Sequence, residues 1–483
     1  MNVLEYYRNR HVRTRMIEFL GGKTFDSATS MFITQCDAGG EGGWDFKKPS
    51  ELEYFWNQGL DVSRSLWDQK WLIAHLDIEY VNFDFPAEPY LDPARTFLLQ
   101  RPVELAIEKI LLSSSISALH ILSGRGHHFS WKINQESTAF GKLIKIGYLP
   151  EHVEKRYAES LPPANVPIDR DLGAAFAGLS LIMEYVAILA KEEADKTSSI
   201  PVELSAVEVP PQIRGKEMVS IDITEYGDLL NTRFIRIPYS LYLKPWHKSG
   251  VLNDEIRDKI PQMVSVPLFE MSVQEGIDVM RNLEHAAELA SRAPSQIPDQ
   301  TAQMLELISA YETSTVAEFH RWFYSEEHEP PELWSRTYDR APFDIMSPCT
   351  RFIMQNPNDL LLRPVGIRLV VRVLLSLGWH PRQIAGLIRS KYERDYGWGG
   401  EWYFYDASTR ADFYTRVFSG LIKLGQDDSK TFDCVPVGES QCCNNKQQNC
   451  KLEDFKRSLL ERLRYERLAG RPFNGLFLPV EYF

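Results

Sequence analysis

The stretch HLDIEYVNFD, residues 75–84, places two carboxylates inside an apolar run that favours a β-strand. Because side chains alternate between the two faces of a strand, Asp77 and Glu79 share one face and the apolar side chains around them share the other. Neighbouring carboxylates repel each other at neutral pH unless a cation lies between them or one acid keeps its proton. The stretch therefore predicts either a divalent metal site or an edge strand with a solvated polar face.

Length and composition set the class of protein. A chain of 483 residues is too long for one ordinary core, and at about 150 residues per domain it predicts two or three units. The net charge of −12 argues against a protein that coats nucleic acid indiscriminately, although a local basic groove remains compatible with it. The N-terminus shows no basic-then-apolar leader, and the longest apolar run, 174–190, is shorter than a bilayer requires. We therefore expect a cytoplasmic protein without a membrane partner.

Four further strands are expected along the chain. An apolar strand at 119–122 runs into the turn SGRGHH (123–128), whose glycines let the backbone approach a ligand closely. After this turn the chain alternates again, which places His128 on the polar face. Strands are also expected at 219–224, where Asp222 lies on the polar face, and at 234–237. Polar groups from separate strands can therefore converge on one place.

Converging acids and nearby cations indicate a particular chemistry. Carboxylates from separate strands are what a two-cation site for phosphoryl or nucleotidyl transfer requires. In the turn, Arg125 and a histidine can neutralise phosphate oxygens. Arg236, Ser240 and Lys244 add anion-binding donors after the last strand. Each signal is weak alone, because a Gly-Arg-Gly turn is also typical of a plain hairpin.

In this order, the motifs resemble those of the archaeo-eukaryotic primase superfamily, over roughly residues 60–270. The acidic strand motif of that family matches LDIE, and the resemblance assigns its metal-binding carboxylates to Asp77 and Glu79. The pair Ile221-Asp222 matches a third motif, so Asp222 becomes the third metal carboxylate.

The resemblance also assigns nucleotide-binding roles. The Ser-x-His motif of the family matches SGRGHH, which places phosphate contacts on Ser123, Arg125 and His128, with His127 as the alternative in register. Downstream, RIPYSLYLK (236–244) matches a segment whose phosphate-binding residues are Arg236, Ser240 and Lys244. The sequence departs from the family here, because Tyr242 stands where histidine is usual.

What the resemblance implies is an α+β protein: a primase-type catalytic domain with an RRM-like sheet core, followed by a helical domain. The implied activity is that of a DNA primase or primase-polymerase, with Mg²⁺ or Mn²⁺ held by the three acids. Single-stranded DNA and nucleoside triphosphates are the implied ligands, and replication or helicase proteins are candidate partners. Two alternatives stay open: a primer-dependent repair or gap-filling polymerase, and a non-catalytic nucleic-acid-binding module.

Five of the six cysteines lie in the last third of the chain, which favours a metal or cluster site over disulfides. This region resembles the iron–sulfur domain of the primase large subunit, where a Pro-Cys pair precedes helices and three further cysteines. The resemblance implies a [4Fe–4S] cluster held by four of Cys349, Cys434, Cys442, Cys443 and Cys450. A Zn²⁺ site or simply reduced cysteines are the alternatives, because thiolates suit both zinc and iron–sulfur.

The helices of this region are locally basic, with eight Lys or Arg against three Asp or Glu in 350–395. Arg368 and Arg372 share one helical face, which predicts a nucleic-acid contact or a solvated basic surface. Trp398, Trp402 and Tyr403 are candidates for base stacking or core packing. The expected domains are a catalytic domain at 1–271, a helical linker region at 272–340 and a cysteine-bearing helical domain at 341–483.

Overall fold

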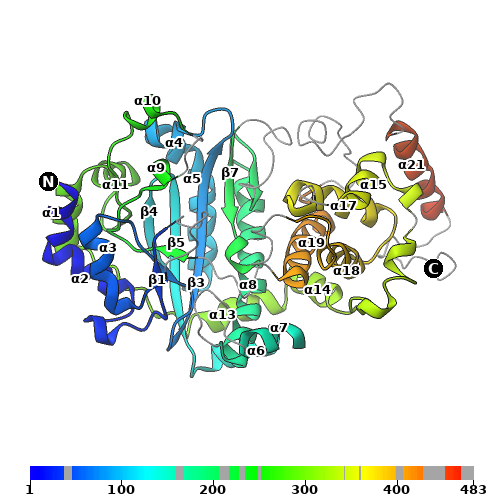
Figure 1. The fold of residues 1–483 in the computed structure, drawn as a ribbon, viewed down its shortest axis with the longest axis horizontal. Coiled ribbons are helices and arrows are strands. Elements are labelled where there is room, and N and C mark those ends of the chain that lie inside the picture. Colours follow the sequence, from blue (N-terminus) through cyan, green and yellow to red (C-terminus); the bar gives the residue numbers. More distant parts are fainter. Residues whose placement is uncertain are drawn as a thin grey trace. The chain divides into compact units, whose positions relative to one another are not determined.

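The computed structural model describes residues 1–36, 46–158, 168–205, 217–227, 234–247, 252–341, 343–357, 361–398, 406–427 and 452–468. The chain forms two compact units (Figure 1), one from Met1–Val207 and Lys216–Ala310 and the other mainly from Tyr311–Phe483. The first unit contains a mixed six-stranded sheet, and the C-terminal region is helical. The predicted α+β class is confirmed at this level.

The main sheet has the strand order β6-β7-β3-β5-β4-β9, in which only β6 and β7 pair in parallel. Its strands are β3 (Trp71–Asn82), β4 (Leu119–Ser123), β5 (Gly126–Asn134), β6 (Val202–Leu204), β7 (Glu217–Asp222) and β9 (Val266–Pro267). A smaller antiparallel sheet has the order β1-β2-β8. Its strands are β1 (Ile33–Thr34), β2 (Ser63–Ser65) and β8 (Phe234–Arg236). The acidic strand and the four further strands that the sequence predicts correspond to β3, β4, β5, β7 and β8.

Helices surround the main sheet in the first unit. They are α1 (Val3–Arg8), α2 (Arg10–Phe19), α3 (Leu52–Gln58), α4 (Glu88–Leu91), α5 (Pro93–Ser113), α6 (Thr138–Ile146), α7 (Glu151–Ala158), α8 (Arg170–Ala194), α9 (Lys244–His247), α10 (Asp254–Arg257), α11 (Val273–Met280), α12 (Leu283–Arg292) and α13 (Met304–Glu312). In the predicted linker region, α11 packs against β4 and α5, and α12 packs against α2. These two helices are therefore part of the first unit.

The second unit is built from helices among its described residues. They are α14 (Thr315–Phe323), α15 (Pro348–Gln355), α17 (Pro364–Ser376), α18 (Pro381–Tyr392), α19 (Ala407–Lys423) and α21 (Leu452–Leu468). The central helix is α19, which packs against α14, α17 and α18.

One face of the main sheet is covered by α5 and α8, which pack against each other and against β3 (Figure 1). The ring of Phe97 on α5 contacts that of His127, which pairs with Ile78 on β3, so this covered face is the apolar face of the acidic strand. We call it the back face. The opposite face, which carries Asp77, is the front face.

The helix α8 is long and apolar enough to span a membrane, the one such helix among the described residues. However, 94% of its apolar window is buried inside the protein. A side chain at Gly178 would collide with the backbone of Leu143 on α6, so the glycine permits the two helices to pack closely. This burial is that of a core helix.

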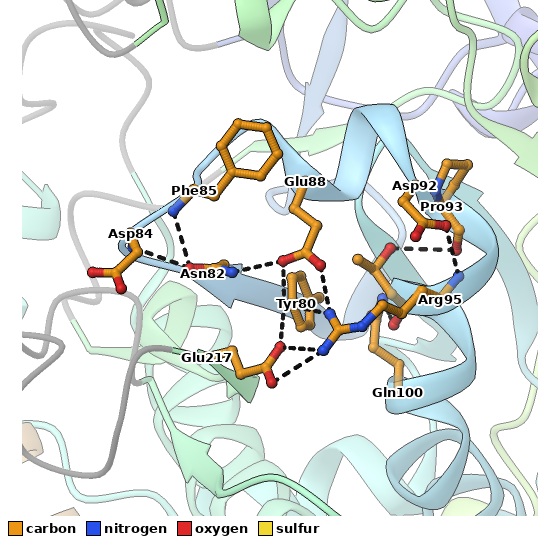
Figure 2. A network of polar contacts seen from close by, with 11 residues as sticks. Tyr80, Asn82, Asp84, Phe85, Glu88, Asp92, Pro93, Arg95, Gln100 and Glu217 are labelled. Carbon is orange, nitrogen blue, oxygen red and sulfur yellow. Dashed lines mark hydrogen bonds and ion pairs between the residues drawn. The ribbon is translucent and has the colours of Figure 1, made fainter.

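A polar network fixes the start of α5 to the sheet (Figure 2). The Asp92 side chain accepts a hydrogen bond from the backbone of Arg95 and caps the helix. The Arg95 guanidinium then bonds Glu88 of α4 at 2.5 Å and Glu217 of β7 at 2.8 Å. The Tyr80 hydroxyl lies 2.6 Å from a carboxylate oxygen of each of these glutamates. The network thus joins α4, α5 and the ends of β3 and β7.

Candidate metal and nucleotide site

Asp77 lies at the centre of a row of polar side chains that crosses three adjacent strands. In the antiparallel register it is directly opposite His128 on β5 and directly opposite Asp222 on β7. Side chains paired in this way project from the same face of a sheet. Two residues further along β3, Glu79 is on the same face. The sheet therefore brings together all three acids that the sequence singled out.

The end of β7 holds Asp222 in place. Its Oδ1 atom accepts hydrogen bonds from the backbone nitrogen of Thr224 at 2.9 Å and from the Thr224 hydroxyl at 2.7 Å. The chain then turns, and the hydroxyl of Tyr226 bonds both the backbone nitrogen and the carbonyl oxygen of His75 at 2.9 Å. This side chain satisfies the backbone of β3 beyond the point where β7 ends, so Asp222 occupies the last paired position of its strand.

The turn between β4 and β5 places the guanidinium of Arg125 beside Glu79. Ser123 pairs with Gly126, which leaves Gly124 and Arg125 as a two-residue turn. A side chain at Gly126 would collide with the carbonyl oxygen of Ile78, and one at Gly124 would collide with the ring of Tyr242. Glycine is therefore required at 126 for the hairpin to lie against β3, and at 124 for the turn to pack against the ring of Tyr242.

The cations of the site pair with Glu79 in the described structure. Arg125 forms an ion pair with one carboxylate oxygen of Glu79, and the Lys244 ammonium lies 3.4 Å from the other. The Nε2 atom of His128 lies 3.4 Å from Oδ1 of Asp77. That oxygen is buried and has no hydrogen-bond partner among the described residues. Glu79 is thus compensated by cations, whereas an oxygen of Asp77 is left without a donor.

These surroundings shift the pKa values of Asp77 and Glu79 in opposite directions. Burial, reinforced by the negative charges of Glu79 and Asp222, raises the pKa of Asp77 well above its ordinary value. Burial acts in the same direction on Glu79, but Arg125 and Lys244 outweigh it and hold the pKa of Glu79 below its ordinary value. Burial lowers the pKa of His128 to about 4, so its imidazole is neutral at neutral pH.

The residues present fit a divalent cation. Asp77, Glu79 and Asp222 supply carboxylate oxygens, which are the ligands that Mg²⁺ and Mn²⁺ prefer. The unpartnered oxygen of Asp77 and its raised pKa both reflect negative charge that the protein itself does not compensate. A cation between the acids would remove that cost.

Three predicted phosphate contacts, Arg236, Ser240 and Ser123, form hydrogen bonds within the protein. Arg236 donates to Oδ2 of Asp61 and to the carbonyl oxygen of Leu241, each at 2.8 Å. The Ser240 hydroxyl accepts the backbone nitrogen of Val62 at 2.7 Å. Ser123 is buried, and its hydroxyl lies 3.4 Å from the carbonyl oxygen of Gly126. Of the predicted phosphate contacts, Arg125, His128 and Lys244 lie beside the acids of β3.

The sequence alone does not indicate where Tyr242 lies. Its ring lies 4.5 Å from the guanidinium of Arg236 and covers Gly124, and its hydroxyl is 3.5 Å from that of Tyr90 on α4. The position had been noted only as a departure from a family pattern. The glycine at 124 was the available signal, because a glycine in a turn often marks a close approach by another group.

The predicted sites of the second unit are only partly described. Arg368 and Arg372 both pair with Asp427, at 2.8 and 2.6 Å, and the Arg368 side chain is 3% exposed. Cys349 is buried near the start of α15, and the indole nitrogen of Trp398 donates to the carbonyl oxygen of Arg394. Outside the described residues lie Trp402, Tyr403, Cys434, Cys442, Cys443 and Cys450.

No family model, curated protein or solved structure matches this chain. The chemistry of the site must therefore be argued from its own geometry. Three carboxylates, two cations and a neutral imidazole on one sheet face suit a ligand that combines divalent metal with phosphate.

Proposed function

We propose that this chain is a DNA primase or primase-polymerase, which transfers nucleotides on a single-stranded DNA template. The observation that carries the proposal is the in-register row of Asp222, Asp77 and His128, with Glu79 beside it. Arg125 and Lys244 lie at the same place and can bind the phosphates of a triphosphate. Metal ligands and phosphate ligands are thus adjacent, as nucleotidyl transfer requires.

The connectivity of the sheet supports a primase-type catalytic domain with an RRM-like core. Apart from α4, α6, α7 and the short strand β6, the chain runs β3-α5-β4-β5-α8-β7, a βαββαβ sequence. The four strands lie in the order β7-β3-β5-β4. Both helices cover the back face, which leaves the front face for the site. An RRM-like core has this arrangement of a four-stranded sheet with helices on one side.

The mechanism follows from the residues. Bound Mg²⁺ or Mn²⁺, held by Asp77, Glu79 and Asp222, would lower the pKa of the attacking 3′-hydroxyl and stabilise the charge of the leaving pyrophosphate. A bound cation would favour the ionised carboxylate of Asp77, whose pKa is raised in the free protein. Arg125 and Lys244 would move from Glu79 to the triphosphate. The neutral imidazole of His128 can donate a hydrogen bond to a phosphate oxygen.

The proposal is tested by a primer-synthesis assay with the full chain. Labelled ribonucleotides and deoxyribonucleotides are supplied separately with unprimed single-stranded DNA, each with Mg²⁺ and with Mn²⁺. We expect dinucleotides and longer products, none of which form with Asp77→Asn. Products that appear only on a primed template identify a repair or gap-filling polymerase. DNA binding without any incorporation, unchanged by Mn²⁺ and by Asp77→Asn, identifies a non-catalytic binding module.

We further propose that the C-terminal cysteines bind a [4Fe–4S] cluster, with Zn²⁺ as the alternative. The support is the clustering of five cysteines in the last third of the sequence. Of these five, the structure describes only Cys349. Iron and sulfide analysis with a visible absorption spectrum, on protein purified without oxygen, separates the two. A colourless protein with one bound zinc excludes the cluster.

A further inference from the structure

A second group of possible metal ligands lies on the back face of the sheet. Glu104 comes from α5, His120 from β4 and His127 from β5, and one ligand atom of each lies within 4.8 Å of the others. The side chain of Glu104 is 1% exposed and that of His120 is 11% exposed, while His127 is fully buried. The turn of the β4–β5 hairpin places both histidines on this face, because Leu122 pairs with His127 and His120 with Phe129.

The group is incompletely hydrogen-bonded. His120 Nε2 and His127 Nδ1 lie 2.9 Å apart and share one hydrogen bond. Whichever ring donates, the Nε2 atom of His127 is buried and has no hydrogen-bond partner among the described residues. Glu104 accepts a bond from Arg101 through one oxygen, but its other oxygen, also buried, has no such partner in the same part of the chain. Buried polar atoms in proteins are seldom left in this state without a ligand.

We propose that Glu104, His120 and His127 bind a Zn²⁺ ion whose fourth position is left to water. Two imidazoles and one carboxylate form a ligand set that zinc takes in proteins, whereas Mg²⁺ prefers oxygen ligands. The surroundings supply outer partners of the kind that orient metal ligands: Arg101 on Glu104, and a Glu108 oxygen 3.7 Å from His120 Nδ1. This site is separate from Asp77, Glu79 and Asp222, which lie on the front face.

The ion would hold the hairpin of the nucleotide site against α5. His127 is the neighbour in sequence of His128, which lies opposite Asp77 on the front face. One turn before Glu104, Gln100 donates a hydrogen bond to the carbonyl oxygen of Arg125 at 3.2 Å. A zinc ion at the back would therefore restrain the same turn that carries Arg125 and leads to His128.

Zinc stoichiometry of the full chain tests the site. The parent protein is the double variant Asp77→Asn/Asp222→Asn. It lacks two of the three front-face carboxylates, so that the front-face site does not add to the zinc stoichiometry. After chelation and desalting, zinc is titrated into the parent and into versions that also carry Glu104→Gln or His127→Gln. We expect each to lose one equivalent of zinc relative to the parent, or to bind that equivalent at least about tenfold more weakly. Any zinc on the cysteines stays equal in all proteins.

A matched control is His75→Gln, because His75 is a buried histidine on the front face, where its Nδ1 contacts Ser130. It should retain the zinc equivalent. Circular dichroism checks that each variant is folded, and two ligand variants are used so that one misfolded protein does not end the test. Equal zinc stoichiometry and affinity in the parent and in both ligand variants would overturn the proposal.

Two further measurements identify the type of ligand atom and test whether zinc restrains the β4–β5 hairpin. Cobalt substitution should give a difference spectrum, parent minus Glu104→Gln, with visible bands of nitrogen and oxygen ligands and without sulfur charge-transfer bands. Hydrogen exchange of residues 119–134 should slow when zinc is added to the parent but not when it is added to Glu104→Gln. A sulfur signature in that difference spectrum would assign the lost metal to cysteines and refute the site. Exchange that zinc leaves unchanged would refute the restraint of the hairpin.

Discussion

Asp77 and Asp222 lie directly opposite each other across β3 and β7, while Arg125 and Lys244 pair with Glu79. The negative charge of Glu79 is therefore compensated, whereas the charges of Asp77 and Asp222 repel each other. Such an arrangement costs stability unless a cation occupies it, and this cost is the physical link between the fold and the proposed metal chemistry.

The first prediction concerns the central acid. Asp77→Asn should reduce nucleotide incorporation by at least about 100-fold, because the site loses a carboxylate that acts on the charge formed in the transition state. Incorporation is measured by gel electrophoresis of labelled primers at saturating Mn²⁺. The matched control is Asp84→Asn, which removes an exposed acid just beyond the end of β3. A variant Asp77→Asn with normal incorporation would falsify the assignment of the acid row.

The second prediction concerns stability in the presence of a chelator. The pKa of Asp77 is higher in the folded than in the unfolded protein, so the folded state holds more protons between the two values. The contribution of Asp77 to the free energy of unfolding therefore falls as pH rises through that window. Asp77→Asn removes this penalty. We expect the variant to be more stable than wild type at pH 7, on the order of 1 kcal/mol, with a smaller difference near pH 5.

The difference between the two proteins is the informative quantity. Buried histidines such as His128, whose pKa is lowered to about 4, give an opposite slope below neutral pH, but they are common to both proteins. Thermal unfolding followed from pH 5 to pH 8 in chelator measures the difference. Added Mg²⁺ should stabilise wild type more than the variant. A difference that shrinks as pH rises would contradict the raised pKa of Asp77.

The third prediction separates a ligand-binding arginine from a structural one. Arg125→Ala should raise the KM for the nucleotide at least about tenfold, because the proposed charge-assisted bond to phosphate is lost. Arg95→Ala breaks the network of Figure 2 instead, where the arginine is 41% exposed. It should leave the KM unchanged and lower the free energy of unfolding by less than about 1 kcal/mol. Steady-state kinetics and thermal unfolding of both variants give the comparison, and equal KM effects would contradict it.

The strands of the site could be predicted because alternation in the sequence directly determines which side chains share a face. The expected strand at 219–224 corresponds to β7, and the acidic stretch lies in β3, although Asp84 falls outside that strand. The register, however, depends on hydrogen bonds between distant segments. Only the structure places Asp222 opposite Asp77, whereas alternation alone had indicated that His128 lies on the polar face, which the register confirms.

The contacts that the sequence does not predict are mainly those between residues far apart in the chain. Nothing in the segment around Arg236 indicates that Asp61 accepts its hydrogen bond. The group on the back face was missed for a similar reason, because Glu104 lies on a helix and its partners on a hairpin. One signal was available: a two-residue turn after Ser123 fixes the pairing of the hairpin, and this places His120 and His127 on one face.

The fourth prediction concerns the basic helix face of the second unit. Asp427 is 2% exposed and pairs with both Arg368 and Arg372. Burial opposes its ionisation, but the two arginines outweigh this effect and hold the pKa of Asp427 below its ordinary value. Its stabilising contribution is therefore present above the unfolded-state pKa and is lost as pH falls through the folded-state pKa.

Asp427→Asn should accordingly lower the free energy of unfolding at pH 7 by about 3–5 kcal/mol, because it leaves buried arginines without a counter-charge. The penalty should shrink in acid. The control is Asp344→Asn, since Asp344 is 97% exposed and lies 3.5 Å from Arg351, an ion pair expected to contribute less than about 1 kcal/mol. Thermal unfolding and single-stranded DNA binding are measured together. Tighter DNA binding by Asp427→Asn at unchanged stability would show that Asp427 masks a nucleic-acid contact of Arg368 and Arg372, instead of holding them in the fold.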